Sequence, residues 1–389
     1  MPVNPPDTVL DPGADALRGG RITRVETIPL RLPLRSAFEI ATGGKRVHLD
    51  VLLVRLHSDS GATGVGESQA WRRMGSSETL RGLVNAVEEV LAPRVLGRSV
   101  FEAPGIMADL DRALWGSPYA KAAVADALLD LQARLLDVPA WCLLGGQARG
   151  VVDLSAVLPI DVDAGRVVDA AIRFHGRGFR SFVVKVGAGG GDAGLVGALR
   201  NALPDAALRL DANASLDFPA ARALADSVAN LGVEAIEQPL APWDIDGMAA
   251  LARATSVPLI ADESVANPQD LLRVLASRAA HGVQTKVAKN GGAWRTRELW
   301  SIATAAGLRI YPGNHPSTSV AAASVAHLAA AWPGNLEPGP FAVGVVDELV
   351  QDVVVEPIVI QGAQVVVPKG PGFGVELDAK IVERHRLDR

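Results

Sequence analysis

The chain has 389 residues, of which 49% are hydrophobic and 21% charged, a composition typical of a folded globular protein and not of a disordered one. Its formal net charge of −5 argues against a nucleic-acid partner, because no surplus of basic side chains is available to neutralise phosphates. The single cysteine, Cys142, cannot form an internal disulfide, and no apolar run approaches the ~20 residues needed to span a bilayer. We therefore expect a cytoplasmic protein that does not insert into membranes.

The first part of the chain predicts a short tail followed by a mixed α+β domain. Residues 1–20 lack the apolar centre of a signal peptide and are expected to be disordered. Strand-like alternation runs through 21–56, and the sequence GATGVGES that follows is interpreted as a glycine-rich hairpin and loop. Two stretches with helical periodicity come next, at 76–97 and 117–141. We assign this domain to 21–148, because strands first and helices afterwards indicate an α+β unit.

From about Gly150 onward, short β-branched runs alternate with helices rich in Ala and Leu. Eight strand candidates with seven helices between them predict a parallel barrel and not a sandwich. We assign the barrel to 149–345 and expect the remaining segment, 346–389, to return to the N-terminal domain. The strand candidates are 153–160, 179–187, 207–215, 233–240, 257–264, 282–292, 307–314 and 334–341.

Ionisable residues stand near the carboxyl ends of five successive strand candidates. They are Lys185, Asp211, Glu237, Asp262 and Lys286, and their successive separations are 26, 26, 25 and 24 residues. One βα unit per residue places each side chain at the same height on the rim where barrel active sites are built. A lone carboxylate at a strand end is more often a helix cap or a surface ion pair, but five residues in register predict an active site.

The three carboxylates of this set predict a metal site. Converging on one rim, they would repel each other strongly unless a cation neutralised them. Ligation by oxygen alone suits a hard divalent ion, Mg²⁺ first and Mn²⁺ second, whereas a zinc site would usually include His or Cys.

Five motifs give the chain a family resemblance. They are LDAN at 210–213, EQP at 237–239, ADES at 261–264, KVAKNGG at 286–292 and GPGFGVELD at 370–378. Together they resemble the enolase superfamily, and within it the mandelate racemase/muconate lactonizing enzyme family, in the branch of muconate lactonizing enzyme. The resemblance extends from about Arg21 to about Asp378.

This resemblance implies a capping α+β domain over a modified (β/α)₇β barrel of the TIM type. It implies that Asp211, Glu237 and Asp262 bind Mg²⁺ and that Lys185 and Lys286 transfer protons. We expect a small-molecule carboxylate as substrate and a homo-oligomer as the assembly.

The chain departs from the family pattern at Val183. The family usually has Lys-x-Lys on the second strand, and here the auxiliary lysine is missing while Lys185 is kept. Glu337 matches a glutamate found on the eighth strand of muconate-type enzymes. Substrate contacts or supporting residues are expected at Asn213, Lys289, Glu337, His315, Trp71 and Phe38.

The predicted activity is that of a Mg²⁺-dependent isomerase. Removing a proton α to a carboxylate creates an enediolate, and a metal on its oxygens stabilises charge that exists only after the proton has left. A racemase or epimerase and a muconate-type cycloisomerase both fit. A dehydratase or a succinylbenzoate synthase-type lyase of the same superfamily remains open, as do a Schiff-base aldolase and an inactive binding or structural barrel.

Overall fold

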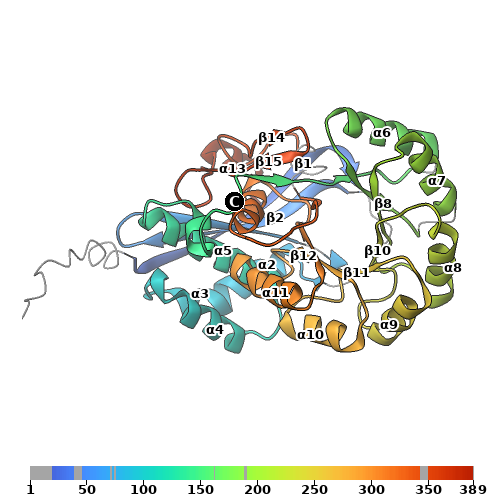
Figure 1. The fold of residues 1–389 in the computed structure, drawn as a ribbon. Coiled ribbons are helices and arrows are strands. Elements are labelled where there is room, and N and C mark those ends of the chain that lie inside the picture. Colours follow the sequence, from blue (N-terminus) through green and yellow to red (C-terminus); the bar gives the residue numbers. More distant parts are fainter. Residues whose placement is uncertain are drawn as a thin grey trace, which may run out of the picture.

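The computed structural model describes residues 20–38, 46–70, 72–73, 76–161, 163–187, 191–341 and 349–388. The N-terminal domain is built on an antiparallel sheet in the order β1-β2-β3 (Figure 1). Its strands are β1 (Ile22–Phe38), β2 (Arg46–Ser58) and β3 (Thr63–Gln69), and a small hairpin of β4 (Arg72–Arg73) and β5 (Ser76–Ser77) follows.

Helices cover one face of this sheet. Their bounds are α2 (Leu80–Asn85), a π-helical segment (Ala86–Leu91), α3 (Ala92–Val95), α4 (Ala103–Ala113) and α5 (Pro118–Leu135). Helix α5 packs on β3 so closely that a Cβ added to Gly66 would lie 2.1 Å from the carbonyl oxygen of Ala123. The segment predicted to be a hairpin and loop is therefore mostly a strand, in which glycine lets the helix approach.

Helix α4 was not predicted from the sequence. Its start does carry a recognisable signal, because Ser99 and Glu102 form a capping box just before it and Pro104 stands in its first turn. The short 3₁₀ turns at Val100–Glu102 and Ala140–Leu144 connect the helices of this domain to their neighbours.

The barrel is a curled sheet of seven parallel strands in the order β13-β12-β11-β10-β9-β8-β7, with helices around its outside (Figure 1). The eighth candidate closes it, since the Glu337 N–H donates to the Ile310 carbonyl at 2.9 Å and the Ser155 N–H donates to the Gly339 carbonyl at 3.0 Å. The strands are β7 (Ala156–Val157), β8 (Ser181–Lys185), β9 (Ala207–Asp211), β10 (Ala235–Glu237), β11 (Leu259–Ala261), β12 (Gly282–Lys286) and β13 (Arg309–Gly313).

Seven helices alternate with these strands, as expected from the sequence. They are α6 (Ala164–Gly176), α7 (Asp192–Ala202), α8 (Phe218–Val228), α9 (Ile245–Ala254), α10 (Pro268–Ser277), α11 (Ala293–Ala305) and α12 (Ser319–Ala330). Leu208 and Leu210 of β9 belong to the main hydrophobic core, whereas Arg209 and Asp211, which alternate with them, face the barrel interior. Every residue of α12 is buried.

Part of the C-terminal segment contacts the N-terminal domain. Helix α13 (Ala379–His385) contacts β1, and the Leu387 N–H donates to the Pro29 carbonyl at 3.0 Å. The strands β14 (Ile360–Gln361) and β15 (Gln364–Val366) pair with each other, and β15 also pairs with β6 (Val151–Asp153), the short strand before β7.

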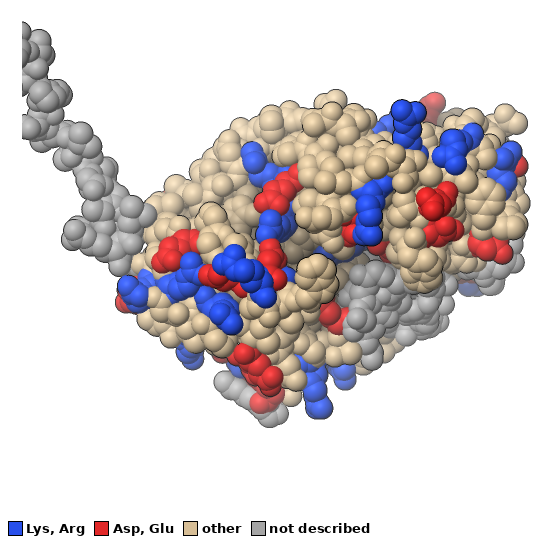
Figure 2. All heavy atoms as spheres, turned by 90° about the horizontal axis from the view of Figure 1, so that it is seen from below, with Lys and Arg blue, Asp and Glu red and all other residues tan. Residues whose placement is uncertain are grey.

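The surface carries both signs of charge. Basic and acidic side chains are intermingled on the face seen in Figure 2. Within the described ranges, no helix combines the length and the apolar character needed to cross a membrane.

Candidate active site

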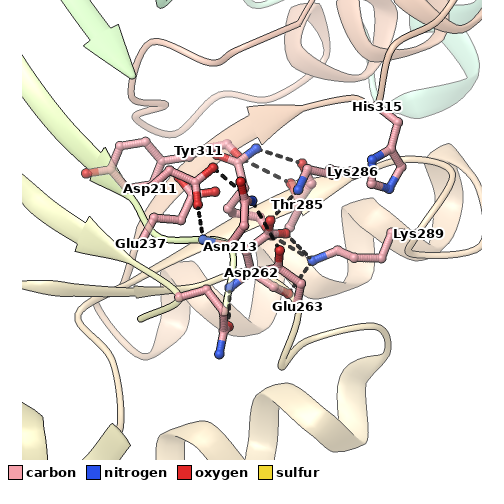
Figure 3. A network of polar contacts seen from close by, with 12 residues as sticks. Asp211, Asn213, Glu237, Asp262, Glu263, Thr285, Lys286, Lys289, Tyr311 and His315 are labelled. Carbon is pink, nitrogen blue, oxygen red and sulfur yellow. Dashed lines mark hydrogen bonds and ion pairs between the residues drawn. The ribbon is translucent and has the colours of Figure 1, made fainter. Parts of the chain in front are cut away.

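Four of the predicted rim residues, Asp211, Glu237, Asp262 and Lys286, lie together in Figure 3. Strand pairing sets Lys185 of β8 beside Asp211 of β9, and Asp211 beside Glu237 of β10. Asp262 directly follows β11, and Lys286 is the last residue of β12. Residues that are one βα unit apart in the sequence therefore lie next to each other on neighbouring strands.

Lys185 is held by the strand next to it. Its ammonium group lies 2.5 Å from Oδ2 of Asp211 and donates to Oδ1 of Asn213 at 3.0 Å. Asn213 has a left-handed backbone, φ +45°, and its N–H donates to Oδ1 of Asp211 at 2.9 Å. The turn after β9 thus places the side-chain amide of Asn213 beside both the lysine and the carboxylate.

Lys286 and Lys289 both pair with Asp262. Lys286 makes a close ion pair with Oδ2, and the buried Lys289 donates to Oδ1 at 2.8 Å. Although burial alone would raise the pKa of Asp262, the charges of Lys286 and Lys289 outweigh it and lower that pKa. Burial would lower the pKa of Lys286, but Asp262, Glu263 and Glu237 raise it instead. Lys289 supports the carboxylate from inside the protein.

Glu237 is the least satisfied member of the set. Its Oε2 lies 3.1 Å from Nε of Arg209, so the two side chains form an ion pair. The N–H of Arg209 is not aligned with Oε2, and Oε2 accepts no hydrogen bond from the described residues. Burial and then the charge of Asp211 raise the pKa of Glu237 to about 7 against the opposing charge of Arg209. Glu263 is half-buried, and its Oε2 atom likewise has no hydrogen-bond partner among the described residues.

Two further residues position Asp262 and Lys286. Gln238 accepts the N–H of Asp262 at 2.9 Å through its side-chain oxygen, with a left-handed backbone at φ +35°. Asn290 accepts the N–H of Lys286 at 2.9 Å. Both residues stand within the motifs at 237–239 and 286–292, but the sequence alone does not give them a site role, because their function depends on contacts between neighbouring strands.

His315 lies at the edge of the site and touches the N-terminal domain. Its Nε2 is 2.7 Å from the hydroxyl of Tyr119 on α5, and the two rings are stacked with centroids 5.5 Å apart. The histidine therefore connects the loop after β13 to the domain that caps the barrel. Trp71 and the side chain of Phe38 lie outside the described residues.

Glu337 does not join the site, which corrects the expectation drawn from its match to muconate-type enzymes. Its N–H pairs with Ile310 near the start of β13, whereas the mouth lies beside Gly313 at the end of that strand. Its Oε1 is 4.0 Å from the guanidinium of Arg309. The register of the closing segment places this glutamate at the amino end of the barrel.

The rim carboxylates fit a hard divalent cation in donor chemistry. All donors are carboxylate oxygens, and among the described residues Oε2 of Glu237 has the ion pair with Arg209 but no hydrogen bond. Among the described residues, no three His, Cys, Asp or Glu side chains stand in a ready-made ligand arrangement, and Asp211 and Asp262 instead hold lysine ammonium groups. Burial and the charge of Asp211 raise the pKa of Glu237, and a bound cation would oppose both effects.

Family models match most of the chain. Residues 22–145 match the model of the mandelate racemase / muconate lactonizing enzyme N-terminal domain, and residues 166–381 match the enolase C-terminal domain-like model. The chain belongs to the mandelate racemase/muconate lactonizing enzyme family of the enolase superfamily. The predicted fold, a modified (β/α)₇β barrel with an N-terminal α+β domain, is confirmed.

Similar proteins are named as isomerases. The chain is 35% identical over 380 residues to the chloromuconate cycloisomerase of Cupriavidus pinatubonensis, covering 92% of this chain and 98% of that protein. It is 32% identical over 368 residues to the N-succinylamino acid racemase of Thermus thermophilus, covering 94% and 98%. The muconate lactonizing enzyme of Pseudomonas fluorescens, solved with muconolactone, superposes with a TM-score of 0.90 at 28% identity, covering 95% of this chain and 100% of that one.

The chain is accordingly an isomerase of this family. Membership also implies a divalent metal ion, in agreement with the oxygen donors on the rim.

Proposed function

We propose that this isomerase removes a proton α to the carboxylate of a small substrate, with Lys185 and Lys286 as the proton-transfer residues. The observation that carries the proposal is the position of the two ammonium groups, on β8 and β12, either side of the carboxylates on the strands between them. Asp211, Glu237 and Asp262 would hold the divalent ion, which we propose to be Mg²⁺, with Mn²⁺ as a substitute.

The two lysines lie on opposite sides of the barrel mouth. Three strands separate β8 from β12, so the ammonium groups approach a bound α-carbon from opposite sides. A lysine must lose its own proton before it can act as a base, and the carboxylates around Lys286 oppose that loss by raising its pKa. A bound Mg²⁺ would supply positive charge that offsets these carboxylates and stabilises the enediolate.

A racemase or epimerase uses both lysines as acid and base. One lysine takes the proton from one face of the α-carbon, and the other returns a proton to the opposite face. The two-sided arrangement supports this mode, and 32% identity to a protein named N-succinylamino acid racemase agrees with it.

A muconate-type cycloisomerase is the second candidate, favoured by 35% identity to a protein named chloromuconate cycloisomerase. In that mode one lysine transfers the proton. The other stays protonated and stabilises the negative charge of the enediolate.

Solvent deuterium exchange into a library of carboxylates tests the proposal, because label at the α-carbon reports proton removal without knowledge of the product. We expect exchange by the holoenzyme, its loss after EDTA treatment, and its return with Mg²⁺ or Mn²⁺. Full exchange in a metal-stripped sample would contradict the metal site. Absence of exchange across the library in folded, metal-loaded protein would contradict proton abstraction.

Lys185→Met and Lys286→Met separate the two modes, since Met keeps the length of the side chain. Each should lower turnover by roughly 10²–10⁴-fold, the usual contribution of a positioned acid or base. Two-base chemistry predicts that each variant still exchanges the α-proton of one enantiomer, and that the enantiomer differs between them. One-base chemistry predicts that one variant loses all exchange. Lys380→Met, at an exposed position on α13, is the matched control.

A further inference from the structure

A second ring of side chains lies inside the barrel, two residues before the mouth residue on each strand. Strand pairing sets Val183 beside Arg209, Arg209 beside Ala235, and Gln284 beside Tyr311. Because alternate residues of a strand face the same side, this inner ring shares the barrel interior with the mouth residues. The inner ring consists of Val183, Arg209, Ala235, Ile260, Gln284 and Tyr311, and Arg209 is its only charged member.

Arg209 is enclosed by its neighbours. The residue is 1% exposed, and its guanidinium carbon lies 4.5 Å from the centroid of the Tyr311 ring. The Tyr311 hydroxyl donates to Oε1 of Glu234 at 2.8 Å, which fixes the ring. The Nε atom of Arg209 lies 3.1 Å from Oε2 of Glu237, one layer nearer the mouth. The guanidinium is therefore held between an aromatic face and a rim carboxylate.

This placement is unfavourable for folding alone. Both terminal nitrogens of Arg209 are buried and have no hydrogen-bond partner among the described residues. A buried charge with incomplete hydrogen bonding costs stability, and an apolar side chain of similar size would serve the core as well. The neighbouring positions Val183 and Ala235 are filled in that apolar way. A charge that weakens the core at this place points to a role in the site above it.

We propose that Arg209 is a positioning residue that keeps the carboxylate of Glu237 turned toward the mouth and available to a divalent cation. It is the only cationic group in the described part of the chain within ion-pair distance of Glu237. The planar guanidinium, stacked on Tyr311, holds the carboxylate from below, on the side away from the substrate. The inference rests on the metal site of the proposed function.

Binding of Mn²⁺ to the metal-stripped protein tests the inference by electron paramagnetic resonance, a readout independent of turnover. Removing a residue that orients a metal ligand typically weakens metal affinity by about 10–100-fold, and we expect a loss of that size in Arg209→Met. Arg209→Lys keeps the positive charge but lacks the planar guanidinium, so its Mn²⁺ affinity should lie between those of Arg209→Met and wild type. Arg309→Met, at the amino end of β13 and 3.8 Å from Glu234, should bind Mn²⁺ as wild type does.

The outcomes separate this inference from the proposed function. If wild type binds no Mn²⁺, both are wrong. If wild type binds Mn²⁺ and folded Arg209→Met binds it equally well, only the role of Arg209 is wrong.

If Arg209→Met does not fold, Arg209→Lys decides the question in a double-mutant cycle with Glu237→Gln. A residue that acts through Glu237 loses its effect on Mn²⁺ affinity when that carboxylate is absent. Additive effects of the two substitutions would overturn the inference.

Discussion

Two groups of buried carboxylates in this molecule are stabilised in different ways. At the junction between the N-terminal domain and the barrel, Glu67 and Asp126 accept hydrogen bonds from backbone N–H groups and hydroxyls. At the mouth, Asp211 and Asp262 hold lysine ammonium groups, and Oε2 of Glu237 accepts no hydrogen bond.

The junction carboxylates cap barrel helices. Glu67 of β3 accepts the Thr318 N–H at 3.0 Å, the Thr318 hydroxyl at 2.5 Å and the Ala321 N–H at 3.0 Å, all at the start of α12. Asp126 of α5 accepts the N–H of Ala293, the first residue of α11, at 2.8 Å. A carboxylate at a helix N-terminus satisfies otherwise unpaired N–H groups and interacts favourably with the helix dipole.

The difference separates structural from functional carboxylates. A carboxylate whose oxygens accept hydrogen bonds at the start of a helix holds two elements of the structure together. A carboxylate paired with a lysine ammonium group at the mouth can exchange that partner for a cation or a substrate. We therefore expect substitutions at the mouth to change chemistry and substitutions at the junction to change stability.

The largest effect is expected from Asp262→Asn at the mouth. The variant should fold and lose at least about 10²-fold in turnover, because Lys286, Lys289 and the metal site all depend on this carboxylate. Steady-state kinetics and thermal unfolding measure the two quantities. Asp226→Asn, on the exposed face of α8, is the matched control. Near-normal turnover in Asp262→Asn would contradict the distinction between functional carboxylates at the mouth and structural carboxylates at the junction.

The next largest effect is expected from Val183→Lys, which should lower the free energy of unfolding. Val183 is 2% exposed and pairs with Arg209 across β8 and β9, so the new lysine would lie next to a buried guanidinium. An uncompensated buried charge costs about 3–5 kcal/mol, measured here as the free energy of unfolding in urea. Val183→Met controls for side-chain length. Equal stability of the two variants would show that the barrel interior accommodates a second cation.

Asp126 and His327 should give opposite pH dependences of stability. Burial raises the pKa of Asp126 from 3.8 to about 6, so its contribution to the unfolding free energy is present below pH 3.8 and lost as the pH rises through 6. Burial lowers the pKa of His327 from 6.5 to about 4, so its contribution is present above pH 6.5 and lost as the pH falls through 4.

Between pH 4 and 6 the two contributions offset each other, and single substitutions should expose them. Asp126→Asn should make the unfolding free energy rise with pH more steeply than in wild type, and His327→Gln should make it fall. Each change amounts to at most about 1.4 kcal/mol per pH unit. Denaturant unfolding at several pH values measures it, and parallel profiles in all three proteins would contradict the assignment.

The smallest effect is expected from Glu67→Gln at the junction. The amide would set a donor against one of the N–H groups that Glu67 now accepts at α12, at a cost of about 1–2 kcal/mol in unfolding free energy. Turnover should stay near wild type, in contrast to Asp262→Asn. A large loss of turnover without a loss of stability would place Glu67 in the active site.

Much of the barrel and its rim could be predicted from the sequence. Strand-like runs recur with helices between them, and an ionisable residue stands at the same place in five successive units, so the set from Lys185 to Lys286 was recognisable. Glu337 was misplaced because the motif around it does not reveal the register of the closing segment. Only the hydrogen bond of its N–H to Ile310 shows that it lies at the amino end of the barrel.

The sequence by itself determined the barrel and the height of each rim residue, because both follow from a local pattern of one βα unit that repeats every 24 to 26 residues. Only the tertiary structure decided the partners: Asp262 for Lys286, Arg209 for Glu237, and the start of α12 for Glu67. Glu67 and Thr318 are 251 positions apart, and no local periodicity relates them. Such pairs depend on barrel closure, strand register and the docking of two domains, all of which arise from the packing of the whole chain.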